Sequence, residues 1–556
     1  MPRMRSCILM FLHLALILPL LSEASTSTYS AVVVDRELIG ISYDDLCDLF
    51  VNDNNNGNTN GDESNDDNDR EMFLTLRRRR NMIAPLLRKI EEAFGTMSVT
   101  NNNSNDEDGD GRGSNNRPSL GFLEITDLPS DMVQLRKKLL PKASKLANLS
   151  SKELMSLERP DTGYSIGWSH GKESFRNADN DDDTRRYDTS KGSFYMNPFI
   201  SSSSNDDSDN NKNKKNNNND SVPAVVVNVY PPSLQPHLEE DLLIMTKFMS
   251  RVGLWIAILC DLYLYEEQHQ QQCELDDDDS NKHNKTYPSL SSFDNNEWMV
   301  YNSLKLGRTA AKARLLYYFP PGQQQQQQHQ QQHQQIEEEH VDNDQVFDDW
   351  CGWHTDHGTL TALLPGMLCD EEEEAGSSKN EKESHSKKRQ SVSSSTSSTH
   401  SKPGLYIQTN NNHGNNNDSD EAQQQQQPEL VHVKLSPNSL GFQLGETLQI
   451  MSKGKFIATP HAVKAPPSSP RTITSADDNI HSMKTKKIGR ASLAVFLQPL
   501  SNQLLPPLVD IDEESSSSSS LQKVKDDNDD GDDFTLRRRW RSTFGEFQRI
   551  TMEVFN

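Results

Sequence analysis

The chain has few apolar residues for its length. Only 33% of its 556 residues are hydrophobic, and the mean hydropathy is −0.80. Long runs of Asn, Asp, Gln and Ser supply much of the rest, and such runs cannot bury a core. About 300 residues of patterned sequence remain without them, which predicts one enzyme-sized domain.

Paired cysteines are also lacking. The chain has six cysteines, with no CxxC motif and no regular pairing in their spacing. Cys7 lies in the N-terminal leader described below, which leaves an odd number. The sequence therefore predicts no disulfide framework.

Acidic residues outnumber basic ones, since 82 Asp and Glu against 57 Lys and Arg give a net charge of −25. Acidic runs such as Asp276–Asp279 and Glu371–Glu374 account for much of the excess. A chain of this sign repels a phosphate backbone, so we expect no nucleic-acid partner. The basic clusters Arg77–Arg80 and Arg537–Arg541 lie near acidic runs and lack regularly interleaved aromatic residues. We interpret them as solvated helix ends or loops.

A long apolar run occurs only at the N-terminus. Arg3 and Arg5 precede the run Cys7–Leu21, and Ser22-Glu23-Ala24 follows it. This pattern predicts a signal peptide over residues 1–24, and about fifteen apolar residues are few for a membrane span. We expect the secretory pathway, in the endoplasmic reticulum lumen or outside the cell. An uncleaved anchor and a cytoplasmic or organellar location stay open. No stable span is expected after cleavage.

Shifts in composition divide the remaining chain into patterned segments and polar tracts. The patterned segments predict an N-terminal helical and strand part at 31–200, supporting helices at 222–312, a strand-rich core at 313–500 and a C-terminal helix at 534–556. Tracts expected to be disordered lie at 201–221, near 323–345, at 371–401, at 410–427 and at 501–533. Those inside the core fall where turns are expected, so we interpret them as loop insertions.

The helical part carries apolar residues at steps of three and four. This spacing predicts a long core helix from Leu238 to about Tyr265 and a single helix over Asp131–Leu146. The segments Gly163–Lys172 and Lys191–Pro198 are rich in glycine and aromatic residues. We interpret both as loops.

Strand patterns dominate the second half. Alternation predicts strands over Arg314–Phe319 and Ile488–Gln498. Glu446–Ser452 and Phe456–Val463, joined by a Lys453-Gly454 turn, predict a hairpin. Closely spaced strands after a helical half favour an all-β core with supporting helices, arranged as a double-stranded β-helix, or jelly roll.

Three residues in this strand-rich half could bind a metal ion. His354 and Asp356 lie two residues apart, and side chains at that spacing share one face of a strand. His461 follows on a later strand. Two imidazoles and one carboxylate form the facial triad of non-haem Fe(II) oxygenases. We predict that His354, Asp356 and His461 are the metal ligands and the catalytic centre.

A second pair follows further along the chain. Arg490 and Ser492 also share a strand face, and together they form a fork for a carboxylate. An HxD motif alone is common by chance. Its occurrence before a strand histidine and an RxS motif, in that order, makes the signal specific. His357 and His432 are interpreted as structural.

The run from Arg314 to Pro499 resembles the isopenicillin N synthase-like branch of the Fe(II)/2-oxoglutarate dioxygenases. The shared pieces are Trp353-His354-Thr355-Asp356, Gly445-Glu446-Thr447-Leu448, Pro460-His461, Arg490-Ala491-Ser492 and the strand that ends in Tyr318-Phe319-Pro320. The loop Gly167–Lys172 is similar to that of uncharacterised plant-type members.

The resemblance implies a jelly roll that binds Fe(II), 2-oxoglutarate and O₂, with ascorbate as an optional reductant. Arg490 and Ser492, helped by Tyr318, would hold the distal carboxylate of 2-oxoglutarate. The implied reaction is hydroxylation, desaturation or a similar oxidation of a small molecule, with release of succinate and CO₂. Two positions depart from the family pattern: Leu316 stands where Asn is usual, and Ala462 where Arg is usual.

Other functions stay open at this point. An Fe(II) oxidase of the same fold would use Arg490 and Ser492 to bind its substrate in place of 2-oxoglutarate. A catalytically silent jelly roll would serve as a binding protein. A zinc hydrolase on the same ligands is disfavoured, because no nearby glutamate is placed as a general base. The sequence indicates no oligomeric state.

Overall fold

The computed structural model describes twelve stretches of the chain. These are residues 33–51, 75–76, 78–96, 118–173, 187–200, 227–275, 299–320, 349–370, 402–409, 429–466, 488–506 and 543–555. The predicted signal peptide, the tracts at 201–221, 323–345, 371–401 and 410–427, and the cluster Arg537–Arg541 lie outside them.

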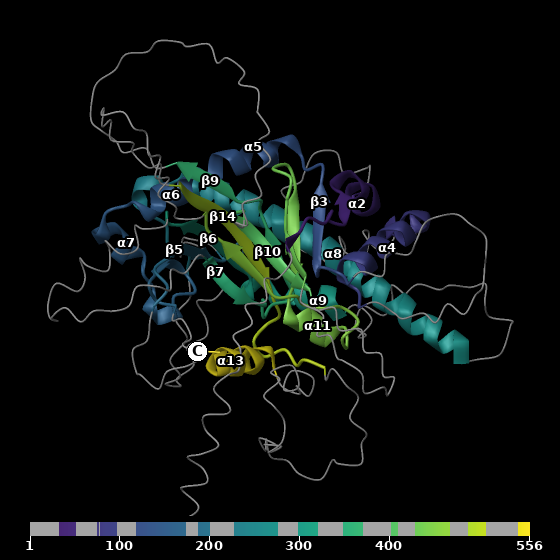
Figure 1. Cartoon of the computed structure of the whole chain (residues 1–556). Helices are drawn as coiled ribbons and strands as arrows, with labels where there is room; N and C mark the ends of the chain where they lie inside the picture. The colour runs from purple at the N-terminus through teal and green to yellow at the C-terminus, as the bar shows by residue number, and fades with distance from the viewer. Residues whose placement is uncertain are drawn as a thin grey trace, which may run out of the picture.

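Strands form the centre of the molecule (Figure 1). Eight of them make up the middle of the two sheets. In chain order they are β6 (Lys312–Tyr318), β7 (Asp349–His354), β8 (Leu360–Leu363), β10 (Gly404–Thr409), β11 (Glu429–His432), β12 (Leu440–Leu444), β13 (His461–Lys464) and β14 (Ile488–Leu497). One sheet contains the order β12-β8-β14-β6 and the other the order β11-β10-β13-β7. The chain thus passes back and forth between two antiparallel sheets, which confirms the predicted jelly roll.

Further strands extend both sheets. They are β1 (Val33–Val34) on the five-stranded sheet, and β2 (Gly40–Ser42), β3 (Phe122–Thr126), β4 (Gly167–His170), β5 (Lys191–Met196) and β9 (Met367–Asp370) on the nine-stranded one. The prediction of loops at Gly163–Lys172 and Lys191–Pro198 was wrong, because β4 pairs with β5 and β5 with β6. Nearly all side chains of β5 are buried, polar ones included, so no alternation of apolar and polar residues marks the strand.

The predicted hairpin at residues 446–463 was also wrong in its first half. Residues Glu446–Met451 form helix α11, with Gly445 as its N-cap. A short buried apolar run does not distinguish a strand from a helix, and here the helix is the outcome. The second half becomes a strand only at His461, while Phe456 forms an isolated bridge with Gly95.

Helices cover the outer face of the nine-stranded sheet. They are α2 (Tyr43–Phe50), α4 (Ile83–Phe94), α5 (Ser130–Leu139), α6 (Pro141–Ala147), α7 (Ser151–Leu157), α8 (His237–Leu275) and α9 (Met299–Leu306), with 3₁₀ turns at Arg80–Met82, Pro160–Thr162, Pro232–Leu234 and Gly307–Ala310. The single helix predicted over Asp131–Leu146 is divided at Leu140, since Pro141 lacks an N–H group for the helical ladder.

The C-terminal helix α13 (Phe544–Phe555) lies beyond α11 at one end of the sheets (Figure 1). Residues 501–506, which we had assigned to a disordered tract, are described in the structure. Leu504 forms a bridge with Thr543 next to α13. The polar tract therefore starts later than the sequence analysis placed it.

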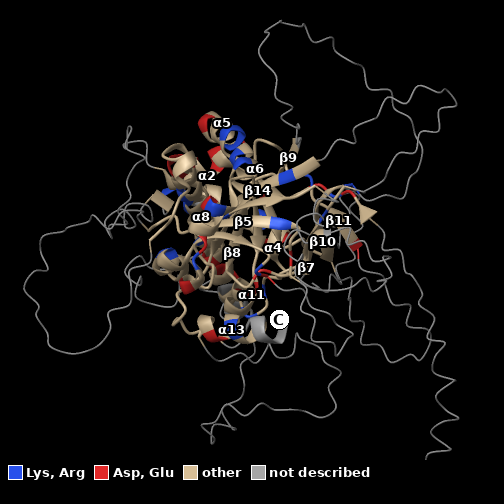
Figure 2. Ribbon diagram, turned by 90° about the vertical axis from the view of Figure 1, so that its left-hand side faces the viewer, with Lys and Arg blue, Asp and Glu red and all other residues tan. Residues whose placement is uncertain are grey.

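The described residues form two apolar cores. The larger lies between the helices and the nine-stranded sheet and includes Leu242, Ile256 and Leu493. The smaller lies between the two sheets and includes Tyr318, Trp350 and Ile407. Charged residues lie mostly on helices and loops, whereas the strands are mostly uncharged (Figure 2). Lys191 on β5 and Arg490 on β14 are two exceptions.

Helix α8 is the central element of the larger core. By length and composition its part His237–Gln268 could cross a membrane, but 72% of its most apolar window is buried inside the protein. The apolar residues at helical spacing face the sheet and the other helices, as the sequence predicted for a core helix.

Asp261 on α8 provides a test of this packing. Its carboxylate accepts backbone N–H groups of Val300 at 2.9 Å and Tyr301 at 2.8 Å, and so caps the start of α9. Burial raises the pKa of Asp261 to about 8, although both N–H donors favour the charged form. The folded protein then binds this proton more tightly than the unfolded chain does, so the contribution of Asp261 to stability falls as pH rises.

We predict that Asp261→Asn, which keeps an acceptor but does not titrate, removes this dependence. The free energy of unfolding of the wild type, relative to the variant, should fall between about pH 4 and about pH 8. Denaturant unfolding across this pH range measures the difference. A constant difference would contradict the raised pKa.

Candidate metal centre

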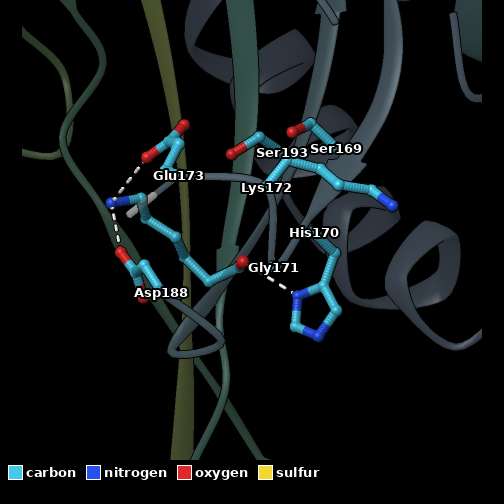
Figure 3. Close-up of a pocket in the computed structure, with 8 residues that line it drawn as sticks. Ser169, His170, Gly171, Lys172, Glu173, Asp188 and Ser193 are labelled. Carbon is cyan, nitrogen blue, oxygen red and sulfur yellow. Dashed lines mark hydrogen bonds and ion pairs between the residues drawn. The ribbon is translucent and has the colours of Figure 1, made fainter. Parts of the chain in front are cut away.

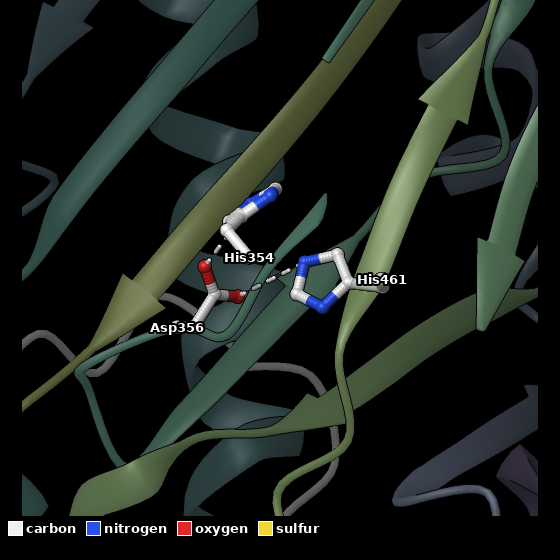
Figure 4. Close-up of side chains that lie close together, drawn as sticks. All are labelled: His354, Asp356 and His461. Carbon is white, nitrogen blue, oxygen red and sulfur yellow. Dashed lines mark ion pairs between the residues drawn. The ribbon is translucent and has the colours of Figure 1, made fainter. Parts of the chain in front are cut away.

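The three predicted ligands come together at one end of the jelly roll. His354 is the last residue of β7, and His461 is the first residue of β13. The two strands are antiparallel neighbours, and their register places His354 directly opposite His461. Asp356 lies in the loop after β7 and points toward both rings (Figure 4).

The distances fit a single metal ion. His354 Nε2 lies 3.9 Å from Asp356 Oδ1, and His461 Nε2 lies 3.9 Å from Asp356 Oδ2. One ligand atom from each residue lies within 4.8 Å of the others. Metal–ligand bonds about 2.1 Å long can bridge atoms up to about 4.2 Å apart, and both His–Asp distances lie within that limit. Two imidazoles and a carboxylate suit Fe(II) in a facial triad.

The local structure that brings His354 and Asp356 together differs from the one that we predicted. We predicted that His354 and Asp356 would share a strand face, but β7 ends at His354 and Asp356 lies outside it. The chain turns at residues 355–359, and that turn brings the carboxylate back beneath the rings. The three side chains do lie together, but the geometric reason that we gave for it was wrong.

Helix α11 holds the turn. The backbone N–H of Glu446 donates to Asp356 O at 2.8 Å, and that of Thr447 donates to Gly358 O at 3.2 Å. The Thr355 hydroxyl donates to the Glu446 carboxylate. A Cβ at Gly445 would lie 2.1 Å from Gly358 O, so only glycine permits this approach. The start of α11 therefore positions the turn that carries Asp356.

Backbone carbonyls orient the two imidazoles. His354 Nδ1 lies 2.8 Å from Gly352 O, and His461 Nδ1 lies 3.4 Å from Thr459 O. With Nδ1–H directed at a carbonyl, each ring leaves Nε2 available to a metal. These two Nε2 atoms are the ones that face Asp356.

Two of the three groups, Asp356 and His461, have the charge that suits a metal cation. Burial and the nearby His354 ring lower the pKa of His461 to about 4, so this imidazole is neutral. Burial raises the pKa of Asp356, but the nearby His461 and His354 rings have the larger combined effect and bring this pKa below its ordinary value. Burial lowers the pKa of His354, yet Cys351 and Asp356 raise it to about 9. A metal must therefore displace a proton from His354.

The predicted carboxylate fork lies on the inner face of the nine-stranded sheet. Arg490 on β14 is directly opposite Tyr318 on β6, with its guanidinium carbon 5.4 Å from the ring centroid. Arg490 and Ser492 are only 7% and 1% exposed. Among the described residues, no acidic side chain forms an ion pair with Arg490. A buried cation without an acidic partner is costly, and an anionic ligand would offset that cost.

Residues of β4, β5 and the segments next to them line a polar pocket (Figure 3). Its lining includes Glu173, Asp188 and Lys191. Lys191 Nζ forms ion pairs with Asp188 at 2.5 Å and with Glu173 at 3.1 Å, and Glu173 also pairs with Arg314 at 2.6 Å. Two cations thus balance two carboxylates. We assign this pocket a structural role, because its own side chains fill and neutralise it.

Two residues near the centre were missed by the sequence analysis. Lys191 stands opposite Tyr318 in the register of β5 and β6, in one row with Arg490. Cys351 Sγ lies 3.8 Å from His354 Nδ1. Lys191 was missed because its strand, β5, shows no alternation of apolar and polar residues and was interpreted as a loop. Cys351 is separated from His354 by only two residues, and that proximity was a usable signal.

The histidines interpreted as structural lie outside the cluster. The His432 ring stacks on Tyr406, with ring centroids 4.8 Å apart. The His357 ring lies 6.1 Å from Phe547 of α13. The two departures from the family pattern, Leu316 and Ala462, are both buried apolar residues next to the site.

No family model and no curated protein matches the sequence. Solved structures that are similar include a full-length protein from Neurospora crassa in complex with alpha-KG, at 12% identity, covering 78% of this chain and 87% of that chain, with a TM-score of 0.39. A second is a putative 2OG-Fe(II) oxygenase family protein from Caulobacter crescentus, at 14% identity, covering 78% of this chain and 90% of that chain, with a TM-score of 0.35. A third is the rice dioxygenase for auxin oxidation, at 11% identity, covering 78% of this chain and 86% of that chain, also with a TM-score of 0.35. The order of the strands in the two sheets itself defines the jelly roll.

Thr361 on β8 offers a test of the centre. Its hydroxyl donates to Asp356 Oδ2 at 2.6 Å. We predict that Thr361→Val weakens Fe(II) binding about tenfold, because outer partners of ligands typically contribute 10- to 100-fold in affinity. Titration of the metal-free protein with Fe(II) under anaerobic conditions measures the effect.

Thr409→Val is the matched control, since Thr409 is a buried strand threonine whose hydroxyl has no hydrogen-bond partner among the described residues. This control should bind Fe(II) as the wild type does. Equal losses of affinity in both variants would show that the Thr361 hydroxyl does not act through Asp356.

Proposed function

We propose that this protein is an Fe(II)- and 2-oxoglutarate-dependent oxygenase that oxidises a C–H bond of a small molecule and releases succinate and CO₂. The observation that carries the proposal is the convergence of His354, Asp356 and His461 on one point. The buried Arg490, which has no acidic partner in the described part of the chain, supports the choice of co-substrate. Bound Fe(II), with O₂ and 2-oxoglutarate, supplies the oxidising power for the reaction.

The protein's own contribution is binding and orientation. His354, Asp356 and His461 would hold the Fe(II) ion and leave coordination positions open for 2-oxoglutarate and O₂. Asp356 remains ionised and His461 neutral, which are the forms that bind a metal. Arg490 would bind the distal carboxylate of 2-oxoglutarate, with the Ser492 hydroxyl two residues along the same strand face.

Tyr318 limits where that carboxylate can lie. Its ring stacks against Trp350, with centroids 5.5 Å apart, and against the guanidinium of Arg490. The two aromatic rings thus keep water from one side of the Arg490 guanidinium. Because Leu316 and Ala462 replace polar family residues, we propose that the hydrogen bonds to the co-substrate come from the Arg490–Ser492–Tyr318 set.

We assign the chain to the isopenicillin N synthase-like, plant-type branch of this oxygenase family on its motifs. The support is the order of HTDHG, PH and RAS motifs and the Gly167–Lys172 segment. We also propose that the protein enters the secretory pathway, on the basis of residues 1–24. Ascorbate would act as a reductant for the iron.

Succinate formation tests the proposed function. We predict that the purified protein, supplied with Fe(II), ascorbate and 2-oxoglutarate, forms succinate, and that a metabolite extract increases the rate. Asp356→Ala should abolish succinate formation and lower the iron content, because it removes the anionic ligand. His432→Ala is the control and should retain both iron and activity.

Each alternative has its own outcome. Substrate oxidation without succinate would identify a 2-oxoglutarate-independent oxidase of the same fold. Iron content unchanged by Asp356→Ala would show that the metal lies elsewhere. A silent binding protein would oxidise nothing in the extract while still adopting the jelly roll.

Arg490→Lys tests the co-substrate site separately from the metal. A lysine retains the charge but cannot form the planar two-pronged contact with a carboxylate. We predict that the KM for 2-oxoglutarate rises about tenfold, which corresponds to the loss of about 1.4 kcal/mol of binding free energy. Iron content should stay at the wild-type value. An unchanged KM would contradict the role of Arg490 as the carboxylate fork.

A further inference from the structure

We propose that the backbone of Pro365 and Gly366 forms a wall against the Arg490 guanidinium, and that the Arg136 side chain holds this wall in place. Gly366 and Arg136 are thus positioning residues for the 2-oxoglutarate carboxylate. The proposal rests on the proposed function. Neither residue belongs to a motif in the sequence, and neither touches the metal ligands. The structure joins them to Arg490 through one short segment, residues 364–366, between β8 and β9.

Gly366 lies flat against the guanidinium. A Cβ at this position would stand 2.5 Å from Nε and from Nη2 of Arg490, and 2.6 Å from its Cζ. The Tyr318 ring lies on the guanidinium as well, with its centroid 5.4 Å away. Arg490 is thus confined by the Gly366 backbone and by Tyr318.

The segment that carries Gly366 is tied to β14 itself. Leu364 N–H donates to Leu493 O at 3.0 Å, and Leu368 of β9 stands opposite Arg490 in the strand register. These contacts set the distance between the wall and the strand that carries Arg490. They leave the carbonyls of Pro365 and Gly366 free to accept other donors.

Arg136 on α5 supplies those donors. Its Nε donates to Pro365 O at 2.9 Å, its Nη2 donates to the same oxygen at 2.5 Å, and Nη2 also approaches Gly366 O at 3.3 Å. Arg136 is only 6% exposed. A planar guanidinium that donates two N–H groups to one carbonyl oxygen defines orientation more strictly than a lysine does.

Helix α5 is a rigid support for this contact. Lys138 on α5 and Lys142 on α6 both form ion pairs with the buried Asp241 of α8, at 2.9 Å and 2.6 Å. The chain of contacts therefore runs from the core helix α8 through α5 and Arg136 to Gly366, and from there to Arg490. A long side chain held in its binding geometry loses less entropy when a ligand arrives.

A side chain at position 366 would move the functional group and not the fold. The atoms that a Cβ would meet are the far end of the Arg490 side chain, and no backbone atom lies as close. Gly366→Ala should therefore displace the guanidinium while costing little stability. This separates the inference from a purely structural role for the glycine.

The test measures binding of N-oxalylglycine, a non-reacting analogue of 2-oxoglutarate, to the Mn(II)-loaded full-length protein by titration calorimetry. We expect Gly366→Ala to raise its Kd about tenfold, with the Kd for Mn(II) and the Tm unchanged. Gly40→Ala is the matched control, because the nearest atom to its Cβ would be 3.5 Å away. That control should bind the analogue as the wild type does.

Arg136→Lys provides an independent arm. It keeps the buried charge but loses the two-pronged contact, so the Kd for N-oxalylglycine should rise while Mn(II) binding is retained. Arg136→Gln should raise the Kd for N-oxalylglycine further. A Tm that falls in both Arg136 variants with an unchanged Kd for the analogue would overturn the positioning role.

The outcomes separate the two proposals. If the Mn(II)-loaded wild type does not bind N-oxalylglycine, the proposed function fails, and this inference fails with it. If the wild type binds the analogue and Gly366→Ala binds it equally well, the proposed function stands and the wall is refuted.

Discussion

The pairing of β7 with β13 is the constraint on which the candidate centre depends. Their register places His354 opposite His461 at one end of the smaller sheet. Two imidazoles are thereby held together before any metal arrives. Asp356 completes the set only because the chain turns sharply after β7, and the first turn of α11 grips that turn through backbone hydrogen bonds. The candidate centre therefore depends on two strand ends and on the start of one helix.

The larger sheet supplies a separate and complementary feature. Its inner face carries a row of Lys191, Tyr318 and Arg490 across three neighbouring strands. Lys191 is neutralised by Asp188 and Glu173, whereas Arg490 has no acidic partner among the described residues. Charge balance thus distinguishes the cation that stabilises the fold from the one that is available to a ligand. The His354–Asp356–His461 cluster lies at the end of one sheet, and the buried Arg490 lies on the inner face of the other.

Much of this arrangement could be predicted from the sequence. The cluster of His354, Asp356 and His461, the pair Arg490 and Ser492, the core helix α8 and the jelly roll all follow from short motifs and apolar periodicity. Strands β4 and β5 could not be predicted, because both of their faces are buried and the alternation that marks a strand is absent. Helix α11 was mistaken for a strand, since six residues are too few for periodicity to decide. Arg136 and Gly366 act through contacts between segments far apart in the chain, which no local pattern records.

The most direct test of the account is a crystal structure of the protein with Mn(II) and N-oxalylglycine. The account predicts one metal ion bound by His354 Nε2, His461 Nε2 and the Asp356 carboxylate, with the distal carboxylate of the analogue on Arg490. A metal ion bound elsewhere, or an analogue whose distal carboxylate does not contact Arg490, would contradict it.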